Sequence, residues 1–257
     1  MIQRRLPHRR RPQPNIFAIL LAMLAFLCLP ALFAFAHAET VPQTARSKAA
    51  YEAQVSGVKA ALAKKGLALG SPVFLQITKE PAELTAYVQD ADGRFQSYRT
   101  WPVCAVSGDL GPKLREGDLQ APEGFYAVRP GQMNPASSYH LSFNLGYPNA
   151  FDRANGRTGS FLMVHGSCVS IGCFAMTDPV IEEIWTLMQA AFEGGQRDVK
   201  VHIFPFPMTE ANLAAHAASE HAAFWQSLKP AWESFAASGQ VPPVTVRNAA
   251  YQVGGAQ

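Results

Sequence analysis

The stretch that most constrains this chain is FLMVHGSCVSIGCFAMTD, which runs from Phe161 to Asp178. Its apolar start predicts a buried strand that ends at His165, and Cys173 follows only eight residues later. Glycines and small residues fill the interval, and Gly172 allows the backbone to approach closely just before the cysteine. Any fold of this chain must therefore hold a strand, a tight returning loop, and a histidine close to a cysteine.

This pairing suits nucleophilic catalysis. A cysteine attacks as its thiolate, and a neighbouring imidazole can both take the proton and stabilise the anion. Backbone N–H groups at Gly172 and Cys173 could form an oxyanion hole, which would complete what acyl transfer from an amide requires. A thiol activated in this way should react with alkylating agents well below the pH at which a free thiol does.

Other interpretations of the same residues remain open at this point. Cys168 and Cys173 could form a disulfide, which would make the segment a structural staple in a non-catalytic binding module. His165, Cys168 and Cys173 could bind zinc, although no obvious fourth ligand stands nearby. The histidine could also be an ordinary buried side chain in a core turn.

Residues 1–38 differ from the rest of the chain. They begin with five arginines and no acidic residue, continue with an apolar run over 16–36, and end in the small-residue pattern Ala-His-Ala. This is typical of a secretory signal, although the apolar run is long enough for an uncleaved membrane anchor. Pro30 and the small residues favour cleavage, and in either case the body of the protein is exported.

Export changes how charge and cysteines are interpreted. Removing the five leader arginines takes the formal net charge from +3 to −2, so a nucleic-acid partner is not expected. Losing Cys28 with the leader leaves Cys104, Cys168 and Cys173. An odd number of cysteines in an oxidising compartment leaves at least one thiol unpaired.

The remaining chain predicts a mainly β core with helices before and after it, an α+β fold. A helix over 44–66 lies in an N-terminal segment, 39–70, and Asp178 with Pro179 should be the N-cap and first residue of a helix after the motif. The polar stretch 131–159 is long for a compact domain and is expected to be functional. Expected strands and further helices have these ranges: strands 72–79, 84–90, 95–103, 121–128, 160–166 and 199–206; helices 211–219 and 222–237, followed by a tail.

Three motifs resemble the L,D-transpeptidase catalytic domain of the YkuD type. HGSCVSIGCFAMTD resembles its active-site signature, and GDLQAPEGFYAV resembles an element upstream of that signature. SFNLGYPNAFDR followed by GRTGSFLMVHG is similar to the YafK-like branch in particular. The resemblance covers about residues 73–206 and implies a β-sandwich catalytic domain over 71–206, with 207–257 as a C-terminal helical extension and tail.

The resemblance assigns roles within the motif. It implies Cys173 as nucleophile and His165 as base, with Ser170 and Gly172 holding the turn. It also implies that a backbone carbonyl of the following residues, Gly166 or Ser167, orients the histidine. The commonest family pattern has polar residues where this chain has Ile171 and Ala175, and the YafK-like branch shares the apolar pattern.

The resemblance also implies a substrate. Such domains form a thioester with a peptidoglycan stem peptide and transfer the peptide to an amine, as a step in cell-wall biogenesis that affects cell shape. Transfer to water would instead make the enzyme an amidase that releases wall-linked protein or peptide. It implies no metal or organic cofactor and a periplasmic location. Arg153 and Arg157 could grip substrate carboxylates, with Tyr147 and Asn149 in the same groove. The alternative is that the arginines are solvated and the other two residues make turns.

Overall fold

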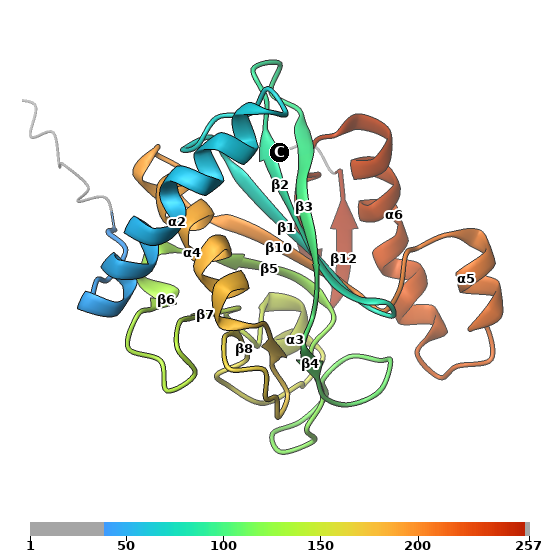
Figure 1. Cartoon of the computed structure of the whole chain (residues 1–257). Coiled ribbons are helices and arrows are strands. Elements are labelled where there is room, and N and C mark those ends of the chain that lie inside the picture. Colours follow the sequence, from blue (N-terminus) through green and yellow to red (C-terminus); the bar gives the residue numbers. More distant parts are fainter. Residues whose placement is uncertain (1–38, 255–257) are drawn as a thin grey trace, which may run out of the picture. The chain divides into compact units, whose positions relative to one another are not determined.

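The computed structural model describes residues 39–254, and both the predicted leader, 1–38, and the last three residues lie outside them. A five-stranded sheet in the order β3-β2-β1-β10-β5 forms the centre (Figure 1). Among the described residues, no helix has the length and apolar character needed to cross a bilayer. The strands of this larger sheet are β1 (Val73–Lys79), β2 (Ala82–Gln89), β3 (Phe95–Pro102), β5 (Gly124–Val128) and β10 (Val199–Phe204).

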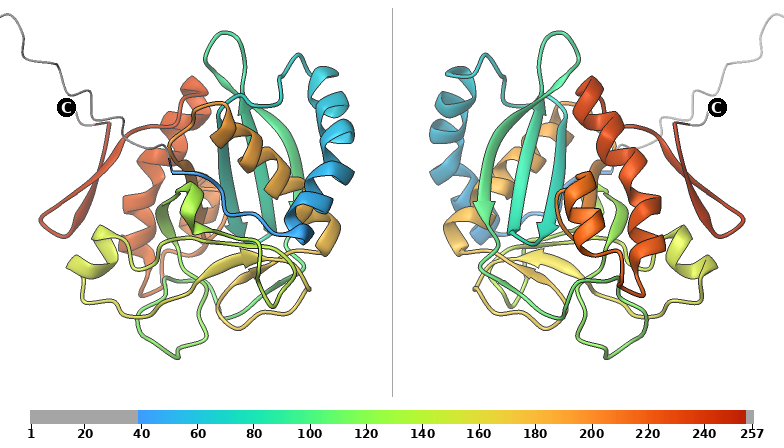
Figure 2. Two further views of the ribbon diagram at one scale, coloured as in Figure 1. Left: turned by 90° about the vertical axis from the view of Figure 1, so that its left-hand side faces the viewer. Right: turned by 90° about the vertical axis from the view of Figure 1, so that its right-hand side faces the viewer.

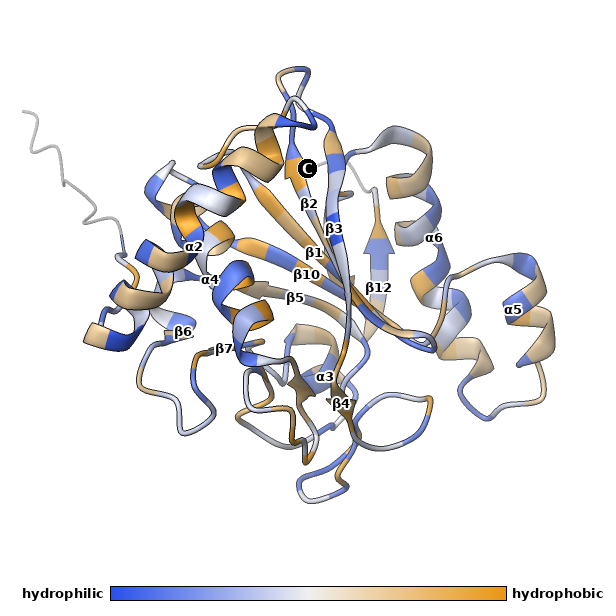
Figure 3. Ribbon diagram, in the orientation of Figure 1, coloured by the Kyte–Doolittle hydropathy of each residue, from blue (hydrophilic) through white to orange (hydrophobic). Residues whose placement is uncertain are grey.

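Strand β1 is buried along its whole length because helices cover both faces of the sheet. Val73, Leu75 and Ile77 alternate onto one face, whereas Phe74 packs against Phe235 on the other. β1 pairs parallel with β10 and antiparallel with β2. Figure 3 shows hydrophobic residues concentrated along these central strands, as a strand covered on both sides requires.

Helices α2 (Ala45–Ala63) and α4 (Asp178–Glu193) lie side by side on one face of the sheet (Figure 2). The Thr44 side chain caps α2 by accepting a hydrogen bond from the Ser47 N–H. The prediction of Asp178 as the N-cap of α4 was wrong by one residue, because Thr177 is the extended residue before the helix. The Asp178 carboxylate accepts a hydrogen bond from the Ser167 N–H instead of capping the helix.

The C-terminal part covers the opposite face with α5 (Glu210–Ala215), α6 (Ala222–Ser238) and a hairpin of β11 (Val244–Arg247) and β12 (Ala250–Val253) (Figure 2). The predicted tail therefore includes a hairpin, and the first of the two predicted helices is shorter than expected. An aromatic cluster that includes Phe125, Phe204, Trp225 and Tyr251 joins these elements to the sheet.

A second five-stranded sheet, in the order β4-β9-β8-β7-β6, carries the sequence motif. Its strands are short: β4 (Ala105–Val106), β6 (Met133–Asn134), β7 (Ser142–Asn144), β8 (Met163–His165) and β9 (Phe174–Ala175). The predicted strand over 160–166 is reduced to β8, because Phe161 has a left-handed backbone, φ 55°, and is exposed. The polar stretch 131–159 contributes β6, β7 and the short helix α3 (Ala150–Ala154).

Candidate active site

The register of the small sheet brings the predicted nucleophile and base together. β8 and β9 are parallel neighbours, and His165 pairs with Ala175. Cys173 immediately precedes β9, so the pairing of β9 with β8 places it beside the strand that ends at His165.

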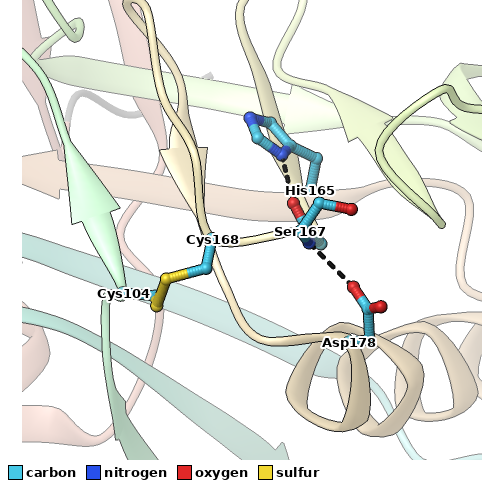
Figure 4. Close-up of a disulfide and its surroundings, with 6 residues drawn as sticks. Cys104, His165, Ser167, Cys168 and Asp178 are labelled. Atoms are coloured by element: carbon cyan, nitrogen blue, oxygen red, sulfur yellow. Dashed lines mark hydrogen bonds between the residues drawn. A yellow bond between two sulfur atoms is a disulfide. The ribbon is translucent and has the colours of Figure 1, made fainter.

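The orientation of His165 fits the role of a base. Its side chain is buried, and its Nδ1 lies 2.6 Å from the carbonyl oxygen of Gly166 (Figure 4). A carbonyl can only accept, so Nδ1 carries the proton and Nε2 is left with a free lone pair. The ring of Tyr139 lies over the imidazole, with 4.7 Å between ring centroids.

Burial lowers the pKa of His165, and its hydrogen bond to Gly166 opposes that shift only in part. The imidazole is therefore neutral near neutral pH, which is the form that can accept a proton. Of the two carbonyls implied by the resemblance, Gly166 is the one that orients the ring.

The Cys173 thiol is half-buried, with its Sγ 3.8 Å from the carbonyl oxygen of Phe161. Burial raises the pKa of this thiol, while a hydrogen bond from the Met163 backbone and the charge of Lys113 lower it in part. The resting group is thus a thiol rather than a thiolate. This differs from the expectation of a cysteine that ionises well below the ordinary range, and it makes proton removal by His165 part of the chemistry.

The turn before Cys173 is held by two hydroxyl groups. Ser170 Oγ accepts a hydrogen bond from the Cys173 N–H at 3.0 Å and donates one to the Cys173 carbonyl at 2.6 Å. The Gly172 N–H donates to Ser107 Oγ, and φ at Gly172 is +93°, a conformation that favours glycine. Both N–H groups predicted for the oxyanion hole are therefore hydrogen-bonded, and a substrate oxyanion would have to replace these hydroxyl partners.

The disulfide pairing differs from the one considered from sequence. Cys168 pairs with Cys104, with 5.3 Å between their Cα atoms, and Cys173 is the free cysteine among the described residues (Figure 4). The Cys168–Cys173 staple is therefore wrong. A zinc site of His165, Cys168 and Cys173 loses one ligand to the disulfide, and residues 39–254 contain no group of three potential metal ligands.

The disulfide and Asp178 hold the loop that follows His165. Ser167 and Cys168 both have left-handed backbones, with φ of 66° and 46°. Asp178 Oδ1 accepts a hydrogen bond from the Ser167 N–H at 2.7 Å, and Cys168 is tied to Cys104 (Figure 4). Two anchors thus stabilise backbone conformations that non-glycine residues adopt only at a cost.

The loop between β4 and β5 lies near the thiol. It contributes Ser107 and also Lys113, whose buried Nζ bonds the Arg115 carbonyl at 3.0 Å and pairs with Asp118. Although burial opposes it, hydrogen bonds from the loop backbone and Lys113 hold the pKa of Asp118 at about 2. Sequence reasoning missed Ser107, Lys113, the bond of Asp178 to the Ser167 N–H and the pairing of Cys104. The odd cysteine count was the one sequence signal that pointed to any of these.

Exposed apolar side chains gather around this site. Phe161 contributes the carbonyl beside Cys173 Sγ, Val169 and Ile171 belong to the turn, and Tyr139 stacks on His165. Within residues 39–254, the large hydrophobic side chains that are most exposed are these four together with two in the β4–β5 loop: Leu114, Leu119, Tyr139, Phe161, Val169 and Ile171. Solvent-exposed apolar surface is thus concentrated on segments that border the thiol and the imidazole.

The predicted substrate-binding residues lie in different surroundings. Tyr147 is buried beside the β4–β5 loop, where its hydroxyl donates to the Lys113 carbonyl at 3.1 Å. Asn149 caps α3 and donates to the Phe125 carbonyl. Arg157 pairs with Asp152 at 2.9 Å and lies over the rings of Phe151 and Phe224. Asn149 and Arg157 are thus engaged in contacts within the protein.

Arg153 is exposed and its guanidinium bonds the Pro148 carbonyl. It lines a cavity beside β5 and β10 whose walls include neither Cys173 nor His165. The structure therefore brings Cys173, His165, Gly172 and Ser170 together, and it places Arg153 elsewhere.

Comparisons with known proteins find similar sequences and similar solved structures. No family model matches the chain. "Putative L,D-transpeptidase YafK" of Escherichia coli strain K12 is 45% identical over 185 residues, which cover 72% of this chain and 75% of that protein, and the O157:H7 protein of the same name matches equally. A similar solved structure is the helical cell shape determining protein Pgp2 of Campylobacter jejuni, with 18% identity and a TM-score of 0.43 over 77% of this chain and 80% of that one. A point mutant of Pgp2 matches with 23% identity and a TM-score of 0.44 over 71% of this chain and 64% of that one.

Proposed function

The chain belongs to the L,D-transpeptidase family, and we propose that it is a cysteine acyltransferase that acts on peptidoglycan stem peptides. The observation that carries this proposal is the geometry of the β8–β9 pair. A free thiol immediately before β9 lies beside β8, which ends at a neutral imidazole whose Nδ1 is held by the Gly166 carbonyl. This is the minimal arrangement for attack on an amide through a thioester.

In the first half of the proposed reaction, His165 Nε2 takes the proton from Cys173 Sγ as the sulfur attacks the amide carbonyl carbon of the stem peptide. A carbon–sulfur bond forms, the carbon–nitrogen bond breaks, and the imidazolium returns its proton to the leaving amine. Because the resting thiol is protonated, His165 has to remove this proton for the sulfur to attack. The charge of Lys113 favours the developing thiolate.

In the second half, an acceptor amine attacks the thioester, His165 removes a proton from that amine, and Cys173 is released as a thiol. Water in place of the amine would give hydrolysis, which is the amidase alternative. The apolar side chains around the opening favour transfer to an amine, because they reduce access of water to the thioester.

The oxyanion must find its donors among backbone groups. Ile171 and Ala175 supply no polar side chain, so the Gly172 and Cys173 N–H groups are the nearest candidates. Their present partners, the hydroxyls of Ser107 and Ser170, would yield to the substrate oxygen. The site of action would be the periplasm, to which the predicted leader, 1–38, would deliver the protein.

The proposal is tested by mass spectrometry of the non-reduced exported protein after incubation with purified peptidoglycan fragments, some of which carry a linked protein peptide. Cys173→Ala is the matched control. A thioester adduct on Cys173 together with dimeric muropeptides is the expected result. Released peptide without dimers would make the enzyme an amidase. Equal product from wild type and Cys173→Ala, or no product and no adduct from either, would overturn the catalytic assignment.

A further inference from the structure

The cavity that Arg153 lines lies on the face of the large sheet that the C-terminal hairpin covers. Its volume is about 890 Å³, and its walls come from β5, β10, the segment before and within α3, and residues 241–246. Neither Cys173 nor His165 lines it. The cavity therefore belongs to a different surface from the candidate active site.

The charges that line this cavity are all positive. Among residues 39–254, Arg129, Arg153 and Lys200 contribute to its walls, and no aspartate or glutamate does. Neither Arg129 nor Arg153 forms a salt bridge with another described residue, whereas Lys200 pairs with Asp198 at 2.7 Å and remains about half exposed. Such an arrangement favours an anionic ligand, since a guanidinium binds a carboxylate through paired hydrogen bonds.

His202 is a buried polar group at this cavity. Its side chain is 3% exposed and is flanked by the rings of Phe74 and Phe125, whose centroids lie 4.9 and 4.7 Å away. No hydrogen bond among the described residues involves its ring nitrogens, and none of these residues has a fully buried side-chain nitrogen or oxygen without a partner, so the ring nitrogens keep access to solvent at the cavity wall.

Two further groups offer hydrogen bonds on the same side. The Tyr251 hydroxyl oxygen accepts hydrogen bonds from Asn149 Nδ2 at 3.0 Å and from the Phe125 N–H at 3.5 Å, and no other described residue accepts its proton. β5 is an edge strand, and the Phe125 backbone faces away from β10 toward these side chains. By strand alternation the Ala127 N–H and carbonyl face the same way, into the cavity.

We propose that this cavity binds an extended peptide that carries carboxylates, at a site separate from Cys173. The edge of β5 at Ala127 offers one donor and one acceptor, which a peptide backbone satisfies and a simple anion does not. Arg129, Arg153 and Lys200 are placed to bind the carboxylates, and Tyr251 and His202 add polar contacts inside the cavity. The proposal does not depend on the catalytic assignment, because it concerns binding at other residues.

The test is a calorimetric titration of the purified exported protein with the tripeptide alanyl-glutamyl-alanine. The analogue alanyl-glutaminyl-alanine amide, which keeps the N-terminal ammonium but lacks both carboxylates, is the matched ligand. We expect the acidic peptide to bind saturably and the analogue to bind at least about tenfold more weakly, since charged hydrogen bonds are lost. Arg153→Ala and Lys200→Ala should each weaken binding by a similar factor, and Arg197→Ala, which removes an exposed arginine outside the cavity, should not.

His202→Phe provides a variant that keeps an aromatic ring among Phe74 and Phe125 while it removes the ring nitrogens. It should weaken binding and leave the circular dichroism spectrum unchanged. Alkylation of Cys173 should leave binding intact. The proposal is overturned if the acidic peptide does not bind, if the cavity variants bind it as well as wild type, or if alkylation of Cys173 abolishes binding, which would place the peptide at the catalytic site.

Discussion

The two sheets of this protein achieve their geometry by different means. β1 of the large sheet is seven residues long and fully buried, and an aromatic cluster seals the other face of that sheet. In the small sheet, β8 and β9 are three and two residues long, and the connecting loop includes left-handed backbones. The loop relies on a disulfide and specific hydrogen bonds, which position reactive groups that burial alone would not orient.

The largest expected effect is the loss of activity when the reactive side chains of the small sheet are removed. Cys173→Ala should abolish product formation, and His165→Asn should lower kcat by about 10²- to 10⁴-fold because the general base is lost. Neither change touches the large sheet, so the thermal unfolding curve should stay close to that of wild type. Muropeptide chromatography measures the products, and a His165→Asn enzyme with unchanged kcat would remove the base from the mechanism.

Removing the disulfide should have the next largest effect. Cys104→Ser combined with Cys168→Ser opens a crosslink between residues 64 apart, which should cost about 2 to 4 kcal/mol in the free energy of unfolding. Activity should fall as well, because Cys168 belongs to the loop that follows His165. Urea unfolding measures the loss, and dithiothreitol should affect wild type but not the double variant. Equal stability with and without the crosslink would show that the loop holds its shape by hydrogen bonds alone.

The large sheet should show its own pH dependence through His202. Burial, together with the nearby Lys200 charge, lowers the pKa of His202 to about 3, below its ordinary value near 6.5. Between pH 6.5 and pH 3 this histidine is protonated in the unfolded chain but neutral in the folded protein. The free energy of unfolding therefore falls as the pH drops through this interval. Between pH 7 and pH 4 the loss should be about 3 kcal/mol.

His202→Phe removes this titrating group and should flatten the dependence over the same interval. Urea unfolding of both proteins at pH 7 and pH 4 gives the comparison. Parallel losses of stability in wild type and variant would assign the acid sensitivity to other groups.

The smallest expected effect concerns the turn before the nucleophile. Ser170→Ala removes the hydroxyl that donates to the Cys173 carbonyl and holds the turn, so kcat should fall by about tenfold, the equivalent of one hydrogen bond of about 1.4 kcal/mol. Ser238→Ala is the matched control, since that hydroxyl bonds the Ser234 carbonyl at the end of α6. A loss of similar size in both variants would indicate a general effect on stability rather than positioning of Cys173.

Local patterns along the chain were sufficient for much of the fold. The short apolar run of β1 and the helical spacing of Ile181, Ile184 and Trp185 predict elements that the structure contains, because strand and helix patterns are set by residues close in sequence. The motif from His165 to Cys173 also predicts two side chains close together, since a short loop between neighbouring strands leaves few other arrangements. The α+β class follows from the same patterns.

Contacts between distant segments could not be predicted in this way. The sequence showed that one of three cysteines outside the leader should be unpaired, but only the pairing of β4 with β9 places Cys104 beside Cys168 and leaves Cys173 free. The bonds of Ser107 to Gly172, and the cavity walls that join β5 to the C-terminal hairpin, likewise depend on long-range packing. The reactive residues and their local turn could thus be predicted from the sequence alone. Their surroundings could not, because burial, pKa and hydrogen-bond partners depend on segments that meet only in the folded chain.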